Sequence, residues 1–520
     1  MTAEPSTADA PTIDLLIVGA GPVGLTAALL FTELGHTVRI VDRRPGPQRA
    51  PAAHVLNART FEVWRQIGID VDAIRVAAQS PSDAGRVYWV HRLGGEVYGW
   101  LPYEQQGDDQ LAITPTPLRN LSQHHLEPLL LAELRSRGID VEYGTTWQSH
   151  IDHGTHAVSR LVSADDDDTA AEAVTSSWLL ACDGAGSAVR GACGIAMDGP
   201  DNLQQFAMVH FRASLDQLVG DDRGVLYWIC DPSAGGTLIR HDHDEWVYMS
   251  SIDDRTPAPG DNDAAAALVR RALADSTVSI EVLRISRWTM TSQLAQHYRQ
   301  GRVLLAGDAA HRFPPSGGMG LNTGVQDVHN LGWKLSGVLR GVLDESVLDT
   351  YGVERRPVAQ RNALASLDNA FRMIEVFQAL ADPEHTGLTE AIARQAPHFD
   401  MLGLQLGYRY PADGSAQPIP SVPPTEAEVR TYIPSSEPGS RLPHGWVTVL
   451  GTTISTLDLV PLDRPVVIAG PTSAVAEPHL RVGHDFDDPH DWWGTTMRLA
   501  SHSHVVVRPD QHIAHRPTTR

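Results

Sequence analysis

The feature that most constrains the fold is a glycine-rich turn that directly follows an apolar segment near the N-terminus. Residues 13–18 read Ile-Asp-Leu-Leu-Ile-Val, and Gly19, Gly21 and Gly24 follow before an alanine-rich helical pattern. A buried strand, a Gly-x-Gly-x-x-Gly turn and a helix in this order form the start of a dinucleotide-binding βαβ unit. The sequence therefore predicts an α/β protein with a Rossmann-like nucleotide-binding domain at its N-terminal end.

Each position of this turn has a physical task. Gly19 permits the tight turn, Gly21 lets a pyrophosphate approach the backbone beside Pro22, and Gly24 lets the helix pack closely on the strand. A second β-rich segment, 37–41, then delivers Asp42 and Arg43. A carboxylate at the end of this strand can hold the ribose hydroxyls of an adenosine.

Composition excludes several classes of protein and site. The net charge of -22 would repel nucleic acid and anionic membranes. The single lysine, Lys334, is followed by Leu335, which excludes a Walker A phosphate loop. The apolar run 15–31 contains three glycines and a proline and is not expected to cross a membrane. A small-molecule substrate is the expected partner.

The three cysteines, Cys182, Cys193 and Cys230, are odd in number and lack CxxC spacing. Neither a disulfide framework nor a thiolate zinc site is indicated. The N-terminal residues lack the pattern of a secretory signal. We therefore expect a cytoplasmic protein.

Two later segments carry further chemistry. An apolar strand at 178–182 ends in Asp183-Gly184, and a second one at 302–306 ends in Gly307-Asp308, before a Pro/Gly loop and a helical pattern through Lys334. Asp308 at a strand end can accept hydrogen bonds from polyol hydroxyls. The loop and the helix start would aim N–H groups at a ligand that becomes anionic on reduction, as a flavin does.

These three motifs, in this order, resemble those of the class A FAD-dependent aromatic hydroxylases, the superfamily of p-hydroxybenzoate hydroxylase and phenol hydroxylase. Tyr351-x-x-Glu-Arg-Arg-Pro resembles the next helix of that family, and the likeness is good over residues 13–400. The resemblance implies a Rossmann-like FAD-binding domain with an inserted β-sheet substrate domain and a C-terminal thioredoxin-like domain. It also implies use of NADPH or NADH and O2 through a flavin C4a-hydroperoxide.

The family likeness assigns roles to matching positions. Asp183 and Asp308 would contact FAD, with Asp308 at the ribityl and phosphate region. Further contacts are expected from the helix near 118–130 and from the Pro/Gly loop with the helix after it, at Arg119, Gln123, Pro315, Gly320, Leu321 and Asn322. An arginine that many relatives carry is replaced by Ala52, so either Arg49 or Arg43 substitutes for it or cofactor affinity differs.

His54 is the residue we expect to act on the substrate. Relatives of phenol hydroxylase place a polar residue there, and a histidine can take the proton of a phenol and so activate the ring. The alternative is a buried histidine that hydrogen-bonds the backbone. The predicted reaction is hydroxylation of a phenolic or polyketide-like aromatic. Baeyer–Villiger oxidation, epoxidation, a reductase without oxygen insertion and a silent flavin-binding scaffold remain alternatives. A homodimer is left open.

The motifs and composition divide the chain into domains. The expected parts are a FAD-binding domain (1–75, 111–190 and 291–400), a substrate sheet domain (76–110 and 191–290), a linker (401–438) and a thioredoxin-like domain (439–520). The last contains no cysteine, so thiol redox chemistry is impossible there. In the substrate domain Trp228, Trp246 and Tyr248 are expected to be core or to line an aromatic pocket.

The 24 histidines raise the question of a metal site. The densest group, His241-Asp-His-Asp-Glu, could place His241 and His243 on one strand face, but a solvated turn is favoured. The acidic run 165–168 is expected to be a surface loop. No metal site is predicted.

Overall fold

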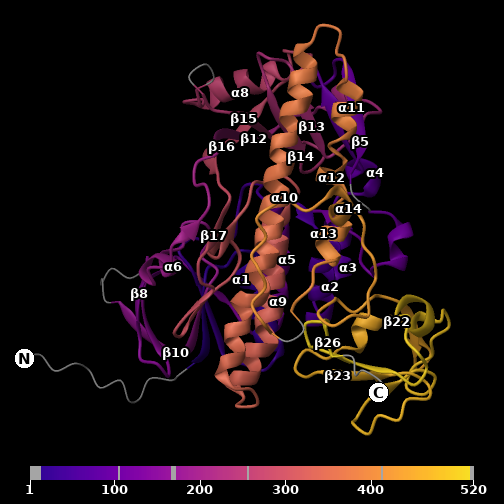
Figure 1. The fold of residues 1–520 in the computed structure, drawn as a ribbon. Coiled ribbons are helices and arrows are strands. Elements are labelled where there is room, and N and C mark those ends of the chain that lie inside the picture. The colour runs from indigo at the N-terminus through magenta and orange to yellow at the C-terminus, as the bar shows by residue number, and fades with distance from the viewer. Residues whose placement is uncertain (1–12, 104–105, 165–170, 254–256, 412–413, 516–520) are drawn as a thin grey trace, which may run out of the picture.

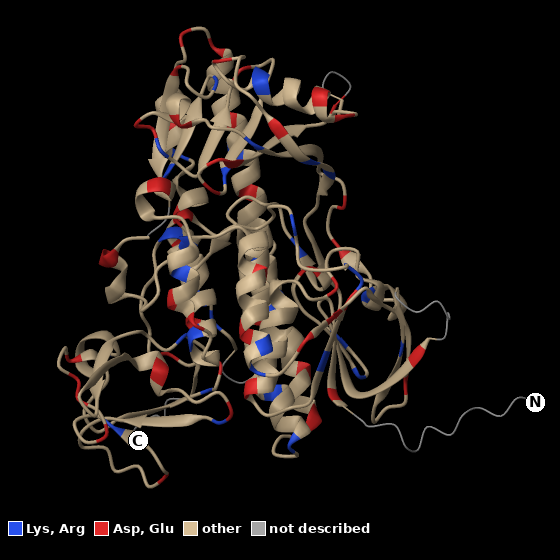
Figure 2. Cartoon of the chain, turned by 180° about the vertical axis from the view of Figure 1, so that it is seen from behind, with Lys and Arg blue, Asp and Glu red and all other residues tan. Residues whose placement is uncertain are grey.

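A computed structural model describes residues 13–103, 106–164, 171–253, 257–411 and 414–515. These residues form two large α/β parts, one above the other in Figure 1, and a smaller C-terminal part beside the lower one. Acidic and basic residues are interspersed along the elements in the view of Figure 2. Among the described residues, no helix is long and apolar enough to span a bilayer. The acidic run 165–168 lies outside the described residues.

The lower part is built on an eight-stranded sheet whose centre is parallel. The path runs β18-β19-β10-β1-β2-β7, and β9 and β8 extend it from β10 as an antiparallel pair. Its strands are β1 (Ile13–Val18), β2 (Val38–Asp42), β7 (Val141–Tyr143), β8 (Thr145–Asp152), β9 (Ala157–Ser163), β10 (Glu172–Ala181), β18 (Arg299–Gln300) and β19 (Val303–Leu305). The predicted Rossmann-like architecture is therefore present.

Helices pack on this sheet around a single large core. Helix α1 (Pro22–Glu33) contacts both α5 (Gln123–Ser136) and α9 (Met319–Leu339), and its apolar side chains are almost all buried. Short elements complete this part: β3 (Val55–Leu56), β6 (Arg119–Asn120), α2 (Ala58–Ile67), α3 (Val71–Ala77), α6 (Ala188–Ala192), η2 (Asp108–Ala112), η3 (Gly307–Ala309), η4 (Glu345–Leu348) and the small sheet β11 (Met197–Asp198), β17 (Gln293–Ala295) and β20 (His311–Arg312).

The upper part contains a seven-stranded sheet with the order β16-β12-β15-β14-β13-β4-β5. Its strands are β4 (Arg86–Val90), β5 (Val97–Pro102), β12 (Gln204–Arg212), β13 (Leu226–Ile229), β14 (Gly236–Arg240), β15 (Glu245–Ser251) and β16 (Glu281–Met290), with the helices α4 (Pro81–Ala84), α7 (Asp216–Val219) and α8 (Asn262–Arg271). Trp246 and Tyr248 are fully buried in the core under α8, whereas Trp228 packs on the opposite face.

One helix joins the two parts. Helix α10 (Asp349–Ala381) has Tyr351 in the core of the eight-stranded sheet and Met373 and Val376 against the seven-stranded sheet (Figure 1). Two further helices, α11 (Leu388–Ala393) and α12 (Ala396–Phe399), cover the same face of the upper sheet. Helices α13 (Leu402–Leu406) and α14 (Glu426–Arg430) follow, and their residues pack on the start of α9.

The C-terminal part has its own core and a four-stranded mixed sheet in the order β24-β23-β25-β26. It comprises β21 (Trp446–Val449), β22 (Thr452–Ser455), η5 (Thr456–Leu459), β23 (Val466–Ala469), β24 (Leu480–Arg481), η6 (Trp492–Thr496), β25 (His504–Val507) and β26 (Ile513–His515). Within 439–515 the structure contains no α-helix, which distinguishes this part from a complete thioredoxin domain.

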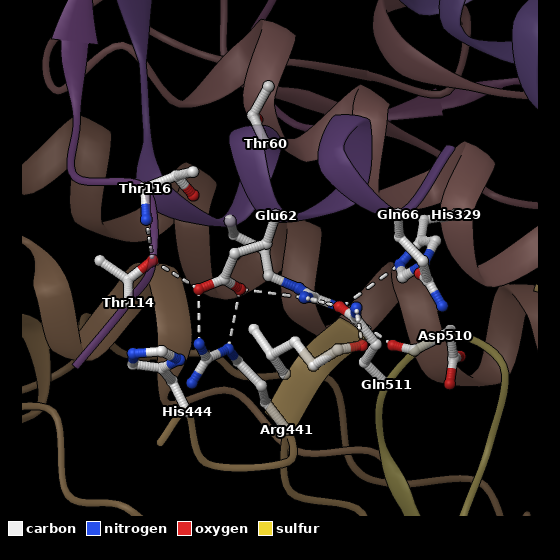
Figure 3. A network of polar contacts seen from close by, with 12 residues as sticks. Thr60, Glu62, Gln66, Thr114, Thr116, His329, Arg441, His444, Asp510 and Gln511 are labelled. Carbon is white, nitrogen blue, oxygen red and sulfur yellow. Dashed lines mark hydrogen bonds and ion pairs between the residues drawn. The ribbon is translucent and has the colours of Figure 1, made fainter. Parts of the chain in front are cut away.

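A buried polar network docks this part onto α2 (Figure 3). Arg441 donates to Glu62, and Gln511 accepts a hydrogen bond from Arg59 at 2.6 Å. Removing charges from water is costly unless they are paired, and here each charge has a partner. The C-terminal part is therefore fixed to the helix that follows the His54 segment.

Candidate functional site

The glycine turn has the geometry that a dinucleotide requires. Gly19 has a φ of +102°, and a Cβ there would lie 2.2 Å from the Cys182 carbonyl oxygen. A Cβ on Gly24 would lie 1.9 Å from the Gly19 carbonyl oxygen, whereas one on Gly21 would meet nothing within 4 Å. Gly19 and Gly24 thus serve close packing, and the backbone at Gly21 is open to a ligand.

A cavity of about 270 Å³ lies beside this turn. Its wall combines the glycine turn, the end of β2 and the Asp183-Gly184 segment with the start of α5 and a segment at β8, and consists of Val18, Gly19, Gly21, Asp42, Arg43, Arg44, Gln123, Thr145, Thr146, Trp147, Cys182, Asp183, Gly184, Gly186 and Ala188. Six of the predicted cofactor residues therefore meet in one cavity: Gly19, Gly21, Asp42, Arg43, Gln123 and Asp183.

Asp42 is held at the end of β2 by backbone donors. Its carboxylate accepts hydrogen bonds from Ala20 N and Arg44 N, each at 2.8 Å, and pairs with the Arg44 guanidinium at 3.0 Å. Arg44 also approaches Glu127 at 3.4 Å, and Gln123 donates to Glu127 at 2.8 Å. This chain of contacts connects the Asp42 end of the cavity to the start of α5.

Asp308 lies at the second strand end, in η3 between β19 and α9. Its side chain is accessible to solvent, yet desolvation by the surrounding protein raises the pKa of its carboxyl. Asp308 Oδ1 lies 3.8 Å from the position that a Cβ on Gly320 would take, at the start of α9.

The loop that leads into α9 is fixed by side chains within the fold. Asn322 accepts hydrogen bonds from Asn57 N at 3.0 Å and Thr60 Oγ1 at 2.7 Å, and donates to Val55 O at 2.8 Å and Gly318 O at 2.7 Å. Its side chain is thus fully engaged. The first N–H groups of α9 have no partner within the helix and remain available to an anion.

Comparison with known proteins decides the family. The FAD binding domain family matches residues 12–366, more than half of the chain. The chain belongs to the FAD-dependent aromatic hydroxylases. It is 32% identical over 503 residues to a putative polyketide hydroxylase of Streptomyces halstedii, covering 95% of this chain and 85% of the relative.

Two other known proteins are similar to this hydroxylase over nearly its whole length. The 2,4-dichlorophenol 6-monooxygenase of Cupriavidus pinatubonensis is 29% identical, with 97% of this chain and 93% of the relative covered. The crystal structure of the flavin-dependent monooxygenase PieE in complex with FAD and substrate superposes with a TM-score of 0.88 at 28% identity, covering 98% of this chain and 96% of that one. The predicted fold class, family and FAD cofactor are confirmed.

The residues of this hydroxylase fit FAD. The open backbone at Gly21 and the first turn of α1 suit a pyrophosphate, and the buried Asp42 suits a ribose. Pro22, at the first position of α1, has no N–H that the helix would leave unpaired. Asp183 has a buried Oδ1 without a protein partner, and desolvation raises the pKa of its carboxyl. A ligand hydroxyl would satisfy this atom.

Other predicted residues are placed less directly. Arg119 lies in β6 rather than in a helix and donates to the carbonyl of Gln106 at 2.6 Å, away from the cavity wall. Arg43 is part of that wall, whereas Arg49 is not. Pro315 is exposed in the turn before α9, and Leu321 is buried in its first turn. Arg44, the neighbour of Arg43, also belongs to that wall.

His54 lies directly before β3, and its backbone carbonyl accepts a hydrogen bond from Leu121 N. The side chain is half-buried, and its Nδ1 is a buried atom without a hydrogen-bond partner. Desolvation lowers the pKa of His54 to about 4, although neighbouring Asn120 opposes this shift. The imidazole is therefore neutral at pH 7 and can accept a proton.

The expectation of a solvated turn at 241–245 is wrong for His241 and Glu245. His241 is 6% exposed, and its ring meets that of His54 edge-on, with centroids 5.5 Å apart. Glu245 is also 6% exposed, whereas Asp242, His243 and Asp244 are exposed, and His243 pairs with Asp216 at 2.7 Å. His241 and Glu245 are buried because the start of α5 packs over them, a contact between distant segments that local sequence does not reveal.

Proposed function

We propose that this hydroxylase inserts oxygen from O2 into a phenolic or polyketide-like aromatic substrate, with NADPH as electron donor and His54 as the base. The observation that carries the proposal is the neutral, half-buried imidazole of His54, whose Nδ1 has no partner in the protein. The names of the relatives, a polyketide hydroxylase and a dichlorophenol monooxygenase, support the substrate class.

His54 would take the proton of the substrate hydroxyl. A phenolate is a better target for electrophilic oxygen than a phenol, so removal of this proton activates the ring. Neutral His241 beside it places no competing positive charge against the imidazolium that forms, since desolvation holds the pKa of His241 well below its usual value. A phenolate paired with His54 would stabilise that imidazolium by direct charge attraction.

FAD, when bound, supplies the transfer of electrons from the nicotinamide and the activation of O2. We assign the adenosine diphosphate portion to the cavity at Gly21, Asp42 and Arg43, and the ribityl region to Asp308. Arg43 replaces the arginine that is missing at Ala52, because it lines the cavity and Arg49 does not. The free cysteines fit a reducing cytoplasm, which we propose as the location.

The test is a comparison of His54→Ala with the wild type, both loaded with FAD. Phenols and polyketide-like quinols are screened for stimulated NADPH oxidation, and incorporation of ¹⁸O from ¹⁸O2 is measured by mass spectrometry. The variant should lose about 100-fold or more in product formation at unchanged FAD content, since general base catalysis contributes about 10²–10⁴-fold.

His243→Ala is the matched control, because His243 lies in the turn that carries His241, the neighbour of His54, but extends into solvent. His54→Asp should recover part of the activity, since a carboxylate can also accept the proton. Equal ¹⁸O incorporation by the wild type and His54→Ala would overturn the role of His54. Failure of every aromatic substrate to stimulate NADPH oxidation would overturn the hydroxylation itself.

A further inference from the structure

A cluster of imidazoles surrounds one carboxylate where the two large parts of the molecule meet. His124 and His125 lie in the first turn of α5, and Glu245 begins β15 of the upper sheet. His210, on the neighbouring strand β12, reaches the same carboxylate. These segments are far apart in sequence, and only the fold assembles them.

We propose that His124, His125 and Glu245 bind a divalent transition metal ion of the Zn²⁺ type. Two imidazoles and a carboxylate form a ligand set that zinc and similar ions accept. One ligand atom from each residue lies within 4.8 Å of the other two. The proposal does not depend on the substrate or on the role of His54.

The distances require only small side-chain movements. His124 Nε2 lies 2.8 Å from Glu245 Oε1, and His125 Nε2 lies 3.9 Å from Glu245 Oε2. Ligand atoms around a tetrahedral zinc ion, about 2.1 Å from the metal, are separated by about 3.4 Å. Shifts on the order of 1 Å in side chains would bring the three groups to these positions.

The contact between His124 Nε2 and the carboxylate of Glu245 is close, but it is poorly aligned for a hydrogen bond. Despite the 2.8 Å separation, His124 Nε2 is a buried atom without a hydrogen-bond partner, in a side chain that is 10% exposed. A buried ring nitrogen without a partner is costly in a protein interior. A cation between this nitrogen and the carboxylate would satisfy both groups.

Neighbouring groups orient the proposed ligands as they do in known metal sites. Ser122 Oγ lies 2.8 Å from His124 Nδ1, so it can fix the tautomer that leaves Nε2 free. His210 Nε2 lies 2.6 Å from Glu245 Oε1 and can donate to it, which leaves Oε2 for the metal. Partners of this kind raise metal affinity about 10–100-fold.

The electrostatic surroundings favour a cation. The carboxylates of Glu245 and Asp242 place negative charge near His125. His125 is 37% exposed, which leaves a path for the ion and for a water ligand.

A metal here would join α5 of the FAD-binding part to the upper sheet. Gln123, which precedes the two histidines, lines the cavity of the cofactor. An ion held by His124, His125 and Glu245 would therefore clamp the start of α5 against β15. We expect it to raise the thermal stability of the whole protein.

The test uses the full-length, FAD-loaded protein without an affinity tag, treated with EDTA and dialysed. Zinc chloride is titrated by calorimetry at pH 7.5, and metal retained after gel filtration is measured by mass spectrometry. We expect one tight site per wild-type chain. His125→Asn and His124→Asn should each weaken binding at least about tenfold, since loss of outer partners alone costs about 10–100-fold.

His243→Asn is the control, because it removes an exposed histidine from the hairpin that ends at Glu245. It should bind zinc as the wild type does. His125→Asn changes a partly exposed side chain and should fold normally, which circular dichroism and FAD content would verify. Absence of a tight site in the wild type, or equal zinc binding by His125→Asn and the wild type, would overturn the proposal.

Discussion

The guanidinium of Arg441 in the C-terminal part donates to the carboxylate of Glu62 in α2, with Nε and Oε2 2.8 Å apart and both side chains fully buried. Arg59 approaches the same carboxylate at 3.0 Å. Two residues before Glu62, Thr60 donates to Asn322 at the start of α9. The ion pair therefore connects the C-terminal part to the loop where we place the flavin.

Replacement of Arg441 by methionine should strongly destabilise the protein. The change leaves Glu62 buried with only Arg59 as a charged partner, and loss of one member of a buried pair costs about 3–5 kcal/mol. Urea denaturation, followed by tryptophan fluorescence, measures the difference. Arg464→Met should have little effect, because Arg464 is exposed and its ion pair with Asp463 lies in solvent.

Alanine substitutions at Gly21 and at Gly24 should impair the protein for different reasons. Gly24→Ala places a Cβ 1.9 Å from the Gly19 carbonyl oxygen, so we expect loss of folded protein. Gly21→Ala has open space for its Cβ, so the protein should fold but bind FAD more than about tenfold more weakly, because the methyl group blocks the pyrophosphate. Flavin fluorescence titration and apoprotein melting separate the two effects. Equal FAD affinity in Gly21→Ala and the wild type would contradict the placement of the pyrophosphate.

Asp308→Ala should weaken FAD binding without lowering the stability of the apoprotein. Desolvation raises the pKa of this carboxyl, so its charge is not stabilised by the protein alone. A hydrogen bond to a charged group contributes about 1.5–3 kcal/mol, which corresponds to about 10–100-fold in FAD affinity. The apoprotein should melt at the same temperature as the wild type or higher. A large fall in the apoprotein melting temperature would instead indicate a structural role.

His398 should make the protein less stable in acid. Desolvation lowers the pKa of this buried histidine to about 3, against an ordinary value of 6.5. Between these values the unfolded chain binds a proton that the folded chain does not, so stability falls as pH decreases from 6.5 toward 3. The slope is about 1.4 kcal/mol per pH unit for one group. His398→Gln should reduce the slope of unfolding free energy against pH over this range.

Local signals were sufficient to predict the adenosine end of the site. Gly19, Gly21 and Asp42 lie within one strand, turn and strand, so their spacing alone brings them together, and they line one cavity. Gln123 and Asp183 required the family likeness. Thr145, Thr146 and Trp147 also line the cavity, but they reach it from β8 and no motif marks them.

Contacts between distant segments explain what the sequence could not reveal. His124 and Glu245 are separated by 121 residues, and each looks like an ordinary polar residue in its own segment. Arg119 was expected in a helix, but β6 pairs with β3 there, and the helix begins only at Gln123. The pattern of a helix start is weak in sequence when a short strand precedes it.

The 33-residue helix α10 limits how this enzyme can admit a substrate. At 1.5 Å per residue it extends about 50 Å, and it is anchored by Tyr351 in one core and by Val376 in the other. A hinge motion that separates the two parts would require α10 to bend or to lose its packing in one of the two cores. We therefore expect substrate, product and nicotinamide to enter and leave when loops and the cofactor move, while the two parts keep a constant separation.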